Sequence, residues 1–181
     1  TVALPGTVNQ YPISALAGIP VCTNGVLRPF AIKLYEGKGY LGTVCSAENS
    51  GSRSDLAAHV LSFDPGNVAA GFGNVLSFPL NYNRESVGGG GAGEWNPWSG
   101  VWLPEMDGDN RRNAEPILGD IEIDSQGNMT IALLDRFAHQ SGKNNRPAIT
   151  GSSALASGMS NGDLLKACKT AGGWVIEGSA G

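Results

Sequence analysis

Residues 115–137, EPILGDIEIDSQGNMTIALLDRF, carry the clearest structural pattern of the chain. Apolar side chains alternate with polar ones at 121 and 123, the turn sequence Ser-Gln-Gly-Asn follows at 125–128, and apolar side chains return at 129, 131 and 133. An apolar period of two on both sides of a Gly/Asn turn predicts a half-buried β-hairpin.

The same pattern occurs upstream at residues 28–46, RPFAIKLYEGKGYLGTVCS. Ile32 and Leu34 alternate before a turn at 36–39, and Tyr40, Gly42 and Val44 alternate after it. The two stretches superpose without a gap at a spacing of 89 residues, which predicts that the chain repeats one structural unit.

Composition favours an all-β protein. The chain has 181 residues with 27 Gly, 10 Pro and only 15% charged residues, which is typical of short strands joined by many turns. Its length fits one domain or part of a larger one, and a first residue Thr1 fits a processed protein or a piece of a longer chain.

A net charge of −4 without a Lys/Arg stripe argues against nucleic acid and anionic membranes as partners. No apolar run approaches the roughly 20 residues of a membrane span.

Further short strands are predicted at 57–63, 75–80, 162–168 and 173–177, although 163–168 also fits one helical turn. We therefore expect antiparallel four-stranded meanders that form about two blades of a β-propeller-like fold. The expected units are an extended arm with one short strand around 7–13 (1–27), a first blade (28–80), a Gly/Trp-rich insertion (81–113) and a second blade (114–181), with a polar loop at 138–145. The insertion explains a repeat longer than the 40–50 residues usual for propellers.

Three cysteines are present, and two of them flank the first hairpin. Cys22 precedes it and Cys45 ends it, so the two thiols approach if the entering segment runs beside the outgoing strand. They form either a disulfide, contributing about 3 kcal/mol by loop closure, or two small buried hydrophobes in a reducing compartment. Cys168 has no obvious partner, and the absence of a CxxC motif argues against zinc.

Two groups of residues are candidates for ligand binding. Trp95, Trp98 and Trp102 either stack on sugar rings or form a small core under a long loop. The second group lies at the hairpin ends and consists of Arg28, Asp135 and Arg136. These residues either face a ligand at one propeller surface or form a structural ion pair.

Calcium is the one cofactor that the sequence brings into consideration. Asp107, Asp109 and Asn110 offer oxygen ligands in a loop but lack the downstream Glu of an EF-hand. Asp120 and Asp124 beside Gly127-Asn128 fit either a calcium site or a plain β-turn. No Ser-His-Asp, Cys-His or G-x-S-x-G arrangement involves His59 or His139, and nothing singles out a carboxylate pair for glycoside hydrolysis.

Several unusual strings occur in a fixed order and resemble a family of large bacterial surface proteins over nearly the whole chain. They are PVCTNG (20–25) with RPF (28–30), YLGTVCSAE (40–48), EWNPW (94–98), and LGDIE (118–122) with LDRF (134–137). That family carries a propeller-like region, often with adhesin modules of serine-aspartate-repeat B type. The resemblance implies secretion, which favours the Cys22–Cys45 disulfide. In that family the propeller region continues past the position of Gly181.

The sequence therefore predicts a structural or adhesive module of a secreted or cell-surface protein rather than an enzyme. Because two blades cannot close a ring, its sheet edges are expected to pair with other copies or with the remainder of a larger propeller. The alternative function is a carbohydrate-binding module, or part of a glycan-acting enzyme, that uses the Trp-rich loop.

Overall fold

The computed structural model describes residue 6 and residues 8–84, 93–101, 114–142, 144–146, 151, 155 and 162–178. Its strands are β1 (Leu27–Tyr35), β2 (Lys38–Cys45), β3 (Ala57–Phe63), β4 (Gly73–Pro79), β5 (Pro116–Ile123), β6 (Met129–Asp135), β7 (Asp163–Thr170) and β8 (Gly173–Ile176). Its helices are the 3-10 turns η1 (Ile13–Ala15), η2 (Arg53–Asp55) and η3 (Val68–Ala70) and the helix α1 (Arg136–Ser141).

The prediction of an all-β protein is confirmed. The strands form two antiparallel meanders, β1-β2-β3-β4 and β5-β6-β7-β8, and neither sheet closes on itself within the described residues.

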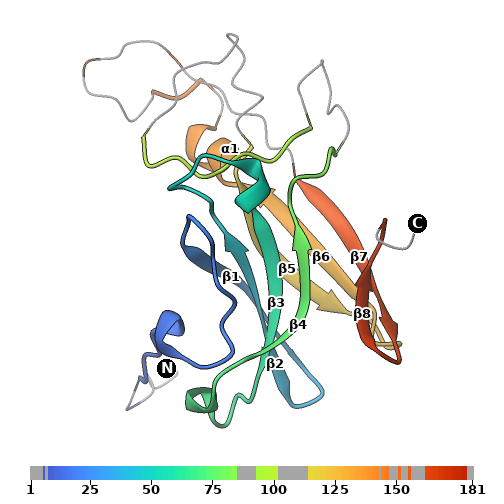
Figure 1. The fold of residues 1–181 in the computed structure, drawn as a ribbon. Coiled ribbons are helices and arrows are strands. Elements are labelled where there is room, and N and C mark those ends of the chain that lie inside the picture. Colours follow the sequence, from blue (N-terminus) through green and yellow to red (C-terminus); the bar gives the residue numbers. More distant parts are fainter. Residues whose placement is uncertain are drawn as a thin grey trace, which may run out of the picture.

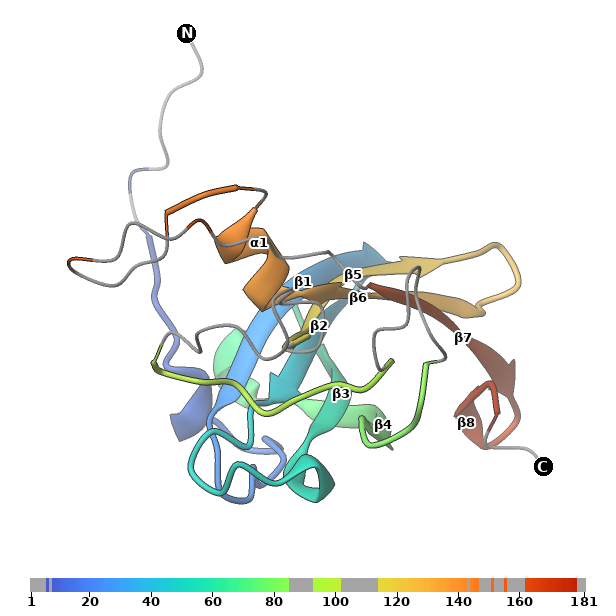
Figure 2. The same ribbon diagram turned by 90° about the horizontal axis from the view of Figure 1, so that it is seen from above.

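The two sheets lie against each other as layers, with α1 at one end and the hairpin turns at the other (Figures 1 and 2). A single core contains side chains from both sheets, among them Val44, Val60, Leu118, Ile121 and Ile131. We call the two faces that meet in this core the inner faces, and the opposite faces the outer faces. Edge strand β1 lies beside β5, and edge strand β4 lies beside β8.

Both hairpins carry a β-bulge at the same place. The β1–β2 register shifts around Phe30, and the β5–β6 register shifts around Gly119, which is 89 residues later. After the bulge, Ile32 pairs with Leu41 and Ile121 pairs with Ile131. The spacing is therefore 89 residues from β1 to β5 but 90 from β2 to β6. The gapless superposition was wrong in the second strand, because the second turn is one residue longer.

Equivalent residues of the two sheets contact each other across the β1–β5 junction. Lys33 Nζ donates to Glu122 Oε2 at 2.5 Å, and the Tyr35 hydroxyl donates to the Asp124 carbonyl at 3.3 Å. Both pairs are 89 residues apart. The two sheets are thus successive copies of one unit that stack with equivalent positions side by side.

The apolar alternation of β1 faces the other way from that of β5. Ile121 and Ile123 are buried on the inner face, whereas Ile32 and Leu34 are exposed on the outer face. The expectation that Ile32 and Leu34 lie on a buried face was therefore wrong. In a stack of like units, one sheet contributes one of its faces and its neighbour contributes the opposite face, so equivalent residues cannot both be buried in one junction.

Three local predictions are settled by the backbone. The described residues of 7–13 hold no strand, and Ile13–Ala15 form a 3-10 turn directly after Pro12, which cannot donate to a ladder. Residues 163–168 belong to a strand and not to a helical turn. The polar loop expected at 138–145 begins instead as helix α1, because Asp135 caps its first turn.

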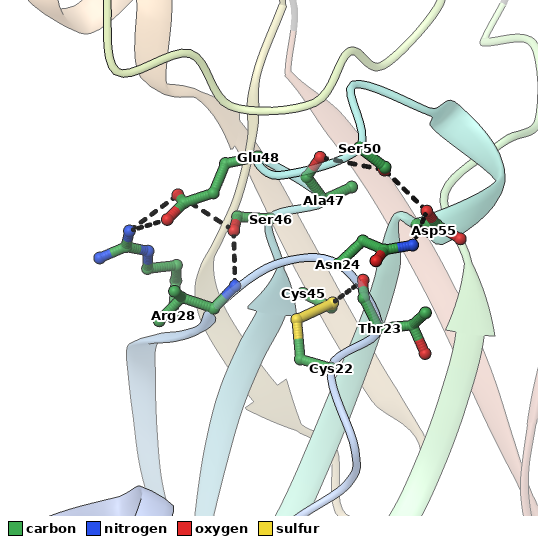
Figure 3. Close-up of a disulfide and its surroundings, with 11 residues drawn as sticks. Cys22, Thr23, Asn24, Arg28, Cys45, Ser46, Ala47, Glu48, Ser50 and Asp55 are labelled. Carbon is green, nitrogen blue, oxygen red and sulfur yellow. Dashed lines mark hydrogen bonds and ion pairs between the residues drawn. A yellow bond between two sulfur atoms is a disulfide. The ribbon is translucent and has the colours of Figure 1, made fainter.

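The predicted disulfide between Cys22 and Cys45 is present and ties the N-terminal segment to the end of β2 (Figure 3). Polar contacts hold the same corner: Asn24 Nδ2 and Ser50 Oγ donate to Asp55 Oδ2 at 3.0 and 2.7 Å. These two bonds hold the pKa of Asp55 below its ordinary value. The third cysteine, Cys168, is exposed and free.

Removing the disulfide is expected to lower the free energy of unfolding by about 3 kcal/mol, because the unfolded chain regains the entropy of a closed loop. Urea denaturation of a Cys22→Ser/Cys45→Ser variant, compared with Cys168→Ser as the matched control, measures this difference. Equal midpoints for the double variant and the control would contradict the prediction.

Candidate functional site

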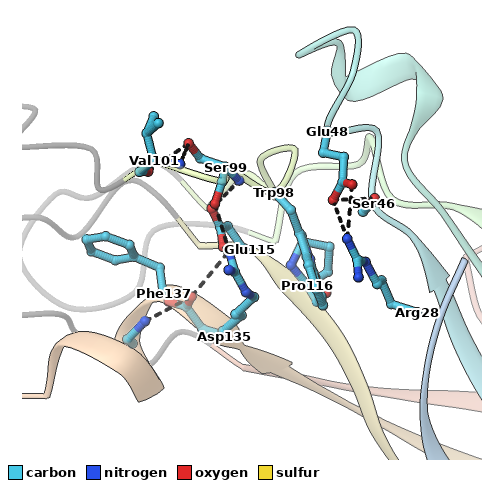
Figure 4. Close-up of polar contacts among 12 residues, drawn as sticks. Arg28, Ser46, Glu48, Trp98, Ser99, Val101, Glu115, Pro116, Asp135 and Phe137 are labelled. Carbon is cyan, nitrogen blue, oxygen red and sulfur yellow. Dashed lines mark hydrogen bonds and ion pairs between the residues drawn. The ribbon is translucent and has the colours of Figure 1, made fainter. Parts of the chain in front are cut away.

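Trp98 is the centre of a cluster at the end of the sheets where α1 lies (Figure 4). Its indole Nε1 donates to the Pro116 carbonyl at 2.8 Å, and its backbone N–H donates to the Ser46 carbonyl at 3.0 Å. Ser46 follows β2 of the first sheet and Pro116 begins β5 of the second. The tryptophan therefore ties the two sheets together at this end.

Two arginines lie over the Trp98 ring. The guanidinium carbons of Arg28 and Arg136 are 5.2 and 4.6 Å from the ring centroid, within the range of cation–π attraction. The Phe30 ring packs against the same indole with a centroid distance of 5.9 Å. Trp98 is consequently buried, with 8% of its surface exposed.

Each arginine is paired with a carboxylate of its own. Arg28 Nη2 donates to both carboxylate oxygens of Glu48, at 2.8 and 3.0 Å. Arg136 Nη1 donates to Glu115 Oε2, and the Ser99 backbone N–H donates to Glu115 Oε1 at 2.8 Å. Burial raises the pKa of Glu115, while the bonds from Ser99 and Arg136 oppose that shift.

Asp135 has a structural role in this cluster. Its Oδ1 accepts from the Ala138 backbone N–H at 3.3 Å, which caps α1, and from the Glu115 backbone N–H at 3.1 Å. The cap begins the helix directly after β6 and places Arg136 in its first turn. Helix α1 thus fixes where the guanidinium of Arg136 can reach.

The structure brings together four of the predicted site residues, namely Arg28, Trp98, Asp135 and Arg136. Their charges and ring faces are used within the cluster, which favours the structural ion-pair interpretation over a ligand surface. Trp95 is fully buried beneath the Arg84 guanidinium, whose carbon lies 3.5 Å from the ring centroid. Neither Trp95 nor Trp98 can stack on a sugar ring in this structure, so for these two the alternative of a small core is supported.

The remaining predicted ligands are placed as follows. Trp102, Asp107, Asp109 and Asn110 lie outside the described residues. Asp124 accepts from the Asn128 side-chain amide at 3.0 Å and from the backbone N–H groups of Asn128 and Gln126, both at 2.9 Å. These bonds lower the pKa of Asp124 and are those of a plain β-turn. No group of three or more potential metal ligands occurs in the described part of the chain.

A pocket of about 430 Å³ lies at the opposite end of the sheets, between the hairpin turns. This volume is within the range of small-molecule sites. It is lined by Tyr35, Glu36, Lys38, Tyr40, Ser62, Val75, Ser125, Gln126, Gly127, Lys169 and Trp174. We call it the turn pocket.

The turn pocket combines aromatic walls with polar groups. The Tyr40 and Trp174 rings pack edge to face at 6.0 Å, and the Trp174 Nε1 donates to the Gly127 carbonyl at 2.8 Å. Lys169 Nζ lies 3.4 Å from the Trp174 ring centroid. Burial and then Glu36 raise the pKa of Tyr40, so its phenol stays protonated near neutral pH.

Sequence reasoning missed the turn pocket and the partners Glu48 and Glu115. The pocket was partly foreseeable, because a repeated hairpin places both turns at the same end of the molecule. The carboxylate partners were not, since Glu48 lies 20 residues from Arg28 and Glu115 lies 21 from Arg136.

Comparisons with known proteins add one relative. The chain is 30% identical over 154 residues to Colossin-A of Dictyostelium discoideum, a match that covers 83% of this chain. The chain spans only 1% of that protein's length. No family model matches the chain, and no solved structure matches it. Among the described helices, none is long and apolar enough to cross a membrane.

Replacing Arg136 by Met is expected to lower the free energy of unfolding at neutral pH by about 3–5 kcal/mol, because the buried Glu115 carboxylate loses its partner. This loss of stability should shrink as pH falls. The Glu115 carboxyl has a raised pKa, so it takes up a proton at a higher pH than an ordinary carboxyl and then needs no cation beside it. Chemical denaturation across acidic and neutral pH measures both effects.

The matched control for this prediction is Arg136→Met combined with Glu115→Gln. Without a buried charge, the double variant should lose much less stability and show little of this pH dependence. If Arg136→Met alone unfolds like wild type at every pH, Arg136 is not held by a structural ion pair.

Proposed function

We propose that this chain is a structural building block of a secreted or cell-surface protein, acting through its sheet faces and edges. The observation that carries the proposal is the stacking of two equivalent four-stranded units, joined by contacts between residues 89 positions apart. A unit that buries one of its faces only against a neighbouring unit suits a repetitive architecture.

The same observation supports neighbouring blades of a β-propeller-like fold as the finer architecture. Each unit is a four-stranded meander, and the first strands β1 and β5 lie side by side, as do the last strands β4 and β8. Propellers have four or more such units, so further units are needed to complete a ring. Other copies or a continuation of the chain would supply them.

An extracellular location is supported by three features. The Cys22–Cys45 disulfide is of a kind that persists in oxidising compartments. The strings at 20–48, 94–98 and 118–137 resemble bacterial surface proteins with adhesin modules, which also favours an adhesive role. The similarity to Colossin-A is compatible with a small unit inside a very long chain.

The edge strands offer one route to assembly. The described strands form two separate ladders, so β1, β4, β5 and β8 each have one side without a ladder partner. Such edges accept strands from other chains by β-augmentation.

The purified chain is therefore expected to self-associate with rising concentration and to turn over no substrate. Sedimentation velocity over a concentration series measures the association, and a panel of glycoside and peptide substrates tests for turnover. A strictly monomeric chain with measurable turnover would overturn the proposal.

Saccharide binding is a second candidate function, and the turn pocket is the observation that favours it. Aromatic surface comes from Tyr35, Tyr40 and the partly buried Trp174, one face of which Lys169 covers. The neutral phenols and two lysines can form hydrogen bonds to sugar hydroxyl groups. This site differs from the Trp-rich loop expected from the sequence.

If the second candidate is right, Trp174→Ala should weaken binding of short oligosaccharides by about tenfold or more, because the ring face is lost. Isothermal titration with ligands chosen from a glycan array measures this. Tyr11→Ala, a truncation of an exposed aromatic residue that does not line the pocket, serves as the control. Unchanged binding by Trp174→Ala would exclude the turn pocket.

A further inference from the structure

We infer that copies of this chain stack head to tail through their outer faces. The outer face of sheet β1–β4 in one copy contacts the outer face of sheet β5–β8 in a second copy. The inference rests on the proposed function, and it names the faces, rather than the edges, as the assembly surfaces. At strand β1, each junction repeats the packing that β5 makes against the first sheet inside a single chain.

The outer face of the first sheet carries residues equivalent to those that the second sheet buries in the internal junction. With a spacing of 89 residues, Ile32 is equivalent to Ile121 and Leu34 to Ile123. Ile121 and Ile123 are buried against the first sheet, with 0% and 9% of their surface exposed. Ile32 and Leu34 are both 64% exposed, so the same apolar pair is presented without a neighbour.

The outer face of the second sheet carries residues equivalent to those that the first sheet buries in the internal junction. With a spacing of 90 residues, Val44 is equivalent to Leu134 and Gly42 to Ala132. Val60 pairs with Gly42 in the first sheet, just as Leu164 pairs with Ala132 in the second. Val44 and Val60 are fully buried in the core, whereas Leu134 and Leu164 are 38% and 70% exposed.

The charges at the junction are also complementary. Inside one chain, Lys33 of the first sheet pairs with Glu122 of the second. Because these two residues are themselves equivalent, the next junction sets Glu122 of one copy beside Lys33 of the following copy. The signs are exchanged but remain opposite, and the Glu122 side chain is 61% exposed. A stack therefore extends this ion pair into an alternating row.

The N-terminal segment limits the size of the contact. On the outer face of the first sheet, Thr43 and Leu61 are fully buried. The N-terminal segment is held at the end of β2 by Cys22–Cys45 and just before β4 by the Phe72 N–H, which donates to the Ala17 carbonyl at 2.9 Å. Contact with a second copy is thus confined mainly to β1. Small interfaces of this kind form weak complexes, so the association is expected only at high protein concentration.

Head-to-tail contact is heterologous, because the two surfaces that meet are different. After the first contact, the pair of copies keeps one free surface of each kind, one on each copy. Growth therefore continues until the rotation between copies closes a ring, or proceeds as an open filament. A contact between two identical faces would stop at a dimer instead.

The test uses two variants of the chain, each blocked on one face. Ile32→Lys/Leu34→Lys blocks the first sheet, and Leu134→Lys/Leu164→Lys blocks the second. All four positions are exposed, so the variants should fold, which circular dichroism checks. Val8→Lys, another exposed apolar position, is the matched control.

In sedimentation velocity, wild type and Val8→Lys should associate equally, and each blocked variant alone should associate at least tenfold more weakly. An equimolar mixture of the two blocked variants should form a heterodimer and nothing larger. Each variant keeps one unblocked face, and the two unblocked faces are of opposite kinds, so a single contact uses both.

Two results would overturn the inference. One is association of either blocked variant at wild-type strength, which would point to the sheet edges and leave the proposed structural function standing. The other is a mixture that stays monomeric while wild type associates. A wild-type chain that is monomeric at every concentration would overturn the self-assembly in the proposed function as well.

Discussion

The two sheets can share one core because they approach each other closely at Gly42. A Cβ at this position would lie 2.4 Å from Leu118 Cδ2 and 3.2 Å from Ile121 Cδ1, so no larger residue fits without displacement. The missing side chain lets β5 pack directly on β2 and bury Ile121 and Leu118 completely. Because the core of this chain lies between its sheets rather than within either one, loss of this contact would expose the inner faces of both.

The two ends of the stacked sheets differ in how they are closed. At the α1 end, Trp98 and its two arginines join residues from both sheets, and the carboxylates of Glu48 and Glu115 compensate the charges. The polar groups of this cluster bond to one another, and the cluster holds the two sheets together. At the turn end, the rings of Tyr40 and Trp174 leave a pocket between the two hairpins. Side chains therefore fill the junction between the sheets at the α1 end, whereas the junction between the two hairpin turns stays open as a pocket.

Much of the fold was predictable because it is encoded locally. The alternation at 121–133, the Gly/Asn turns and the matching pattern at 28–46 correctly placed all four hairpin strands and the all-β class. Helix α1 was missed because six residues carry too little periodicity, although Asp135 was visible as a potential cap. Of the candidate site, Arg28, Trp98, Asp135 and Arg136 were named, but their role was left open because their partners lie about 20 residues away.

The repeated hairpin, its spacing and the cysteine pair available for a disulfide can be recognised in the sequence, since each depends on neighbouring residues or on a visible pattern. Which face of each strand is buried depends instead on the packing of one sheet against the other. Alternation defines two faces but does not say which one meets a neighbour, so Ile32 and Ile121 have the same local pattern and opposite environments. The difference arises because two like sheets in a stack must present opposite faces to their common junction.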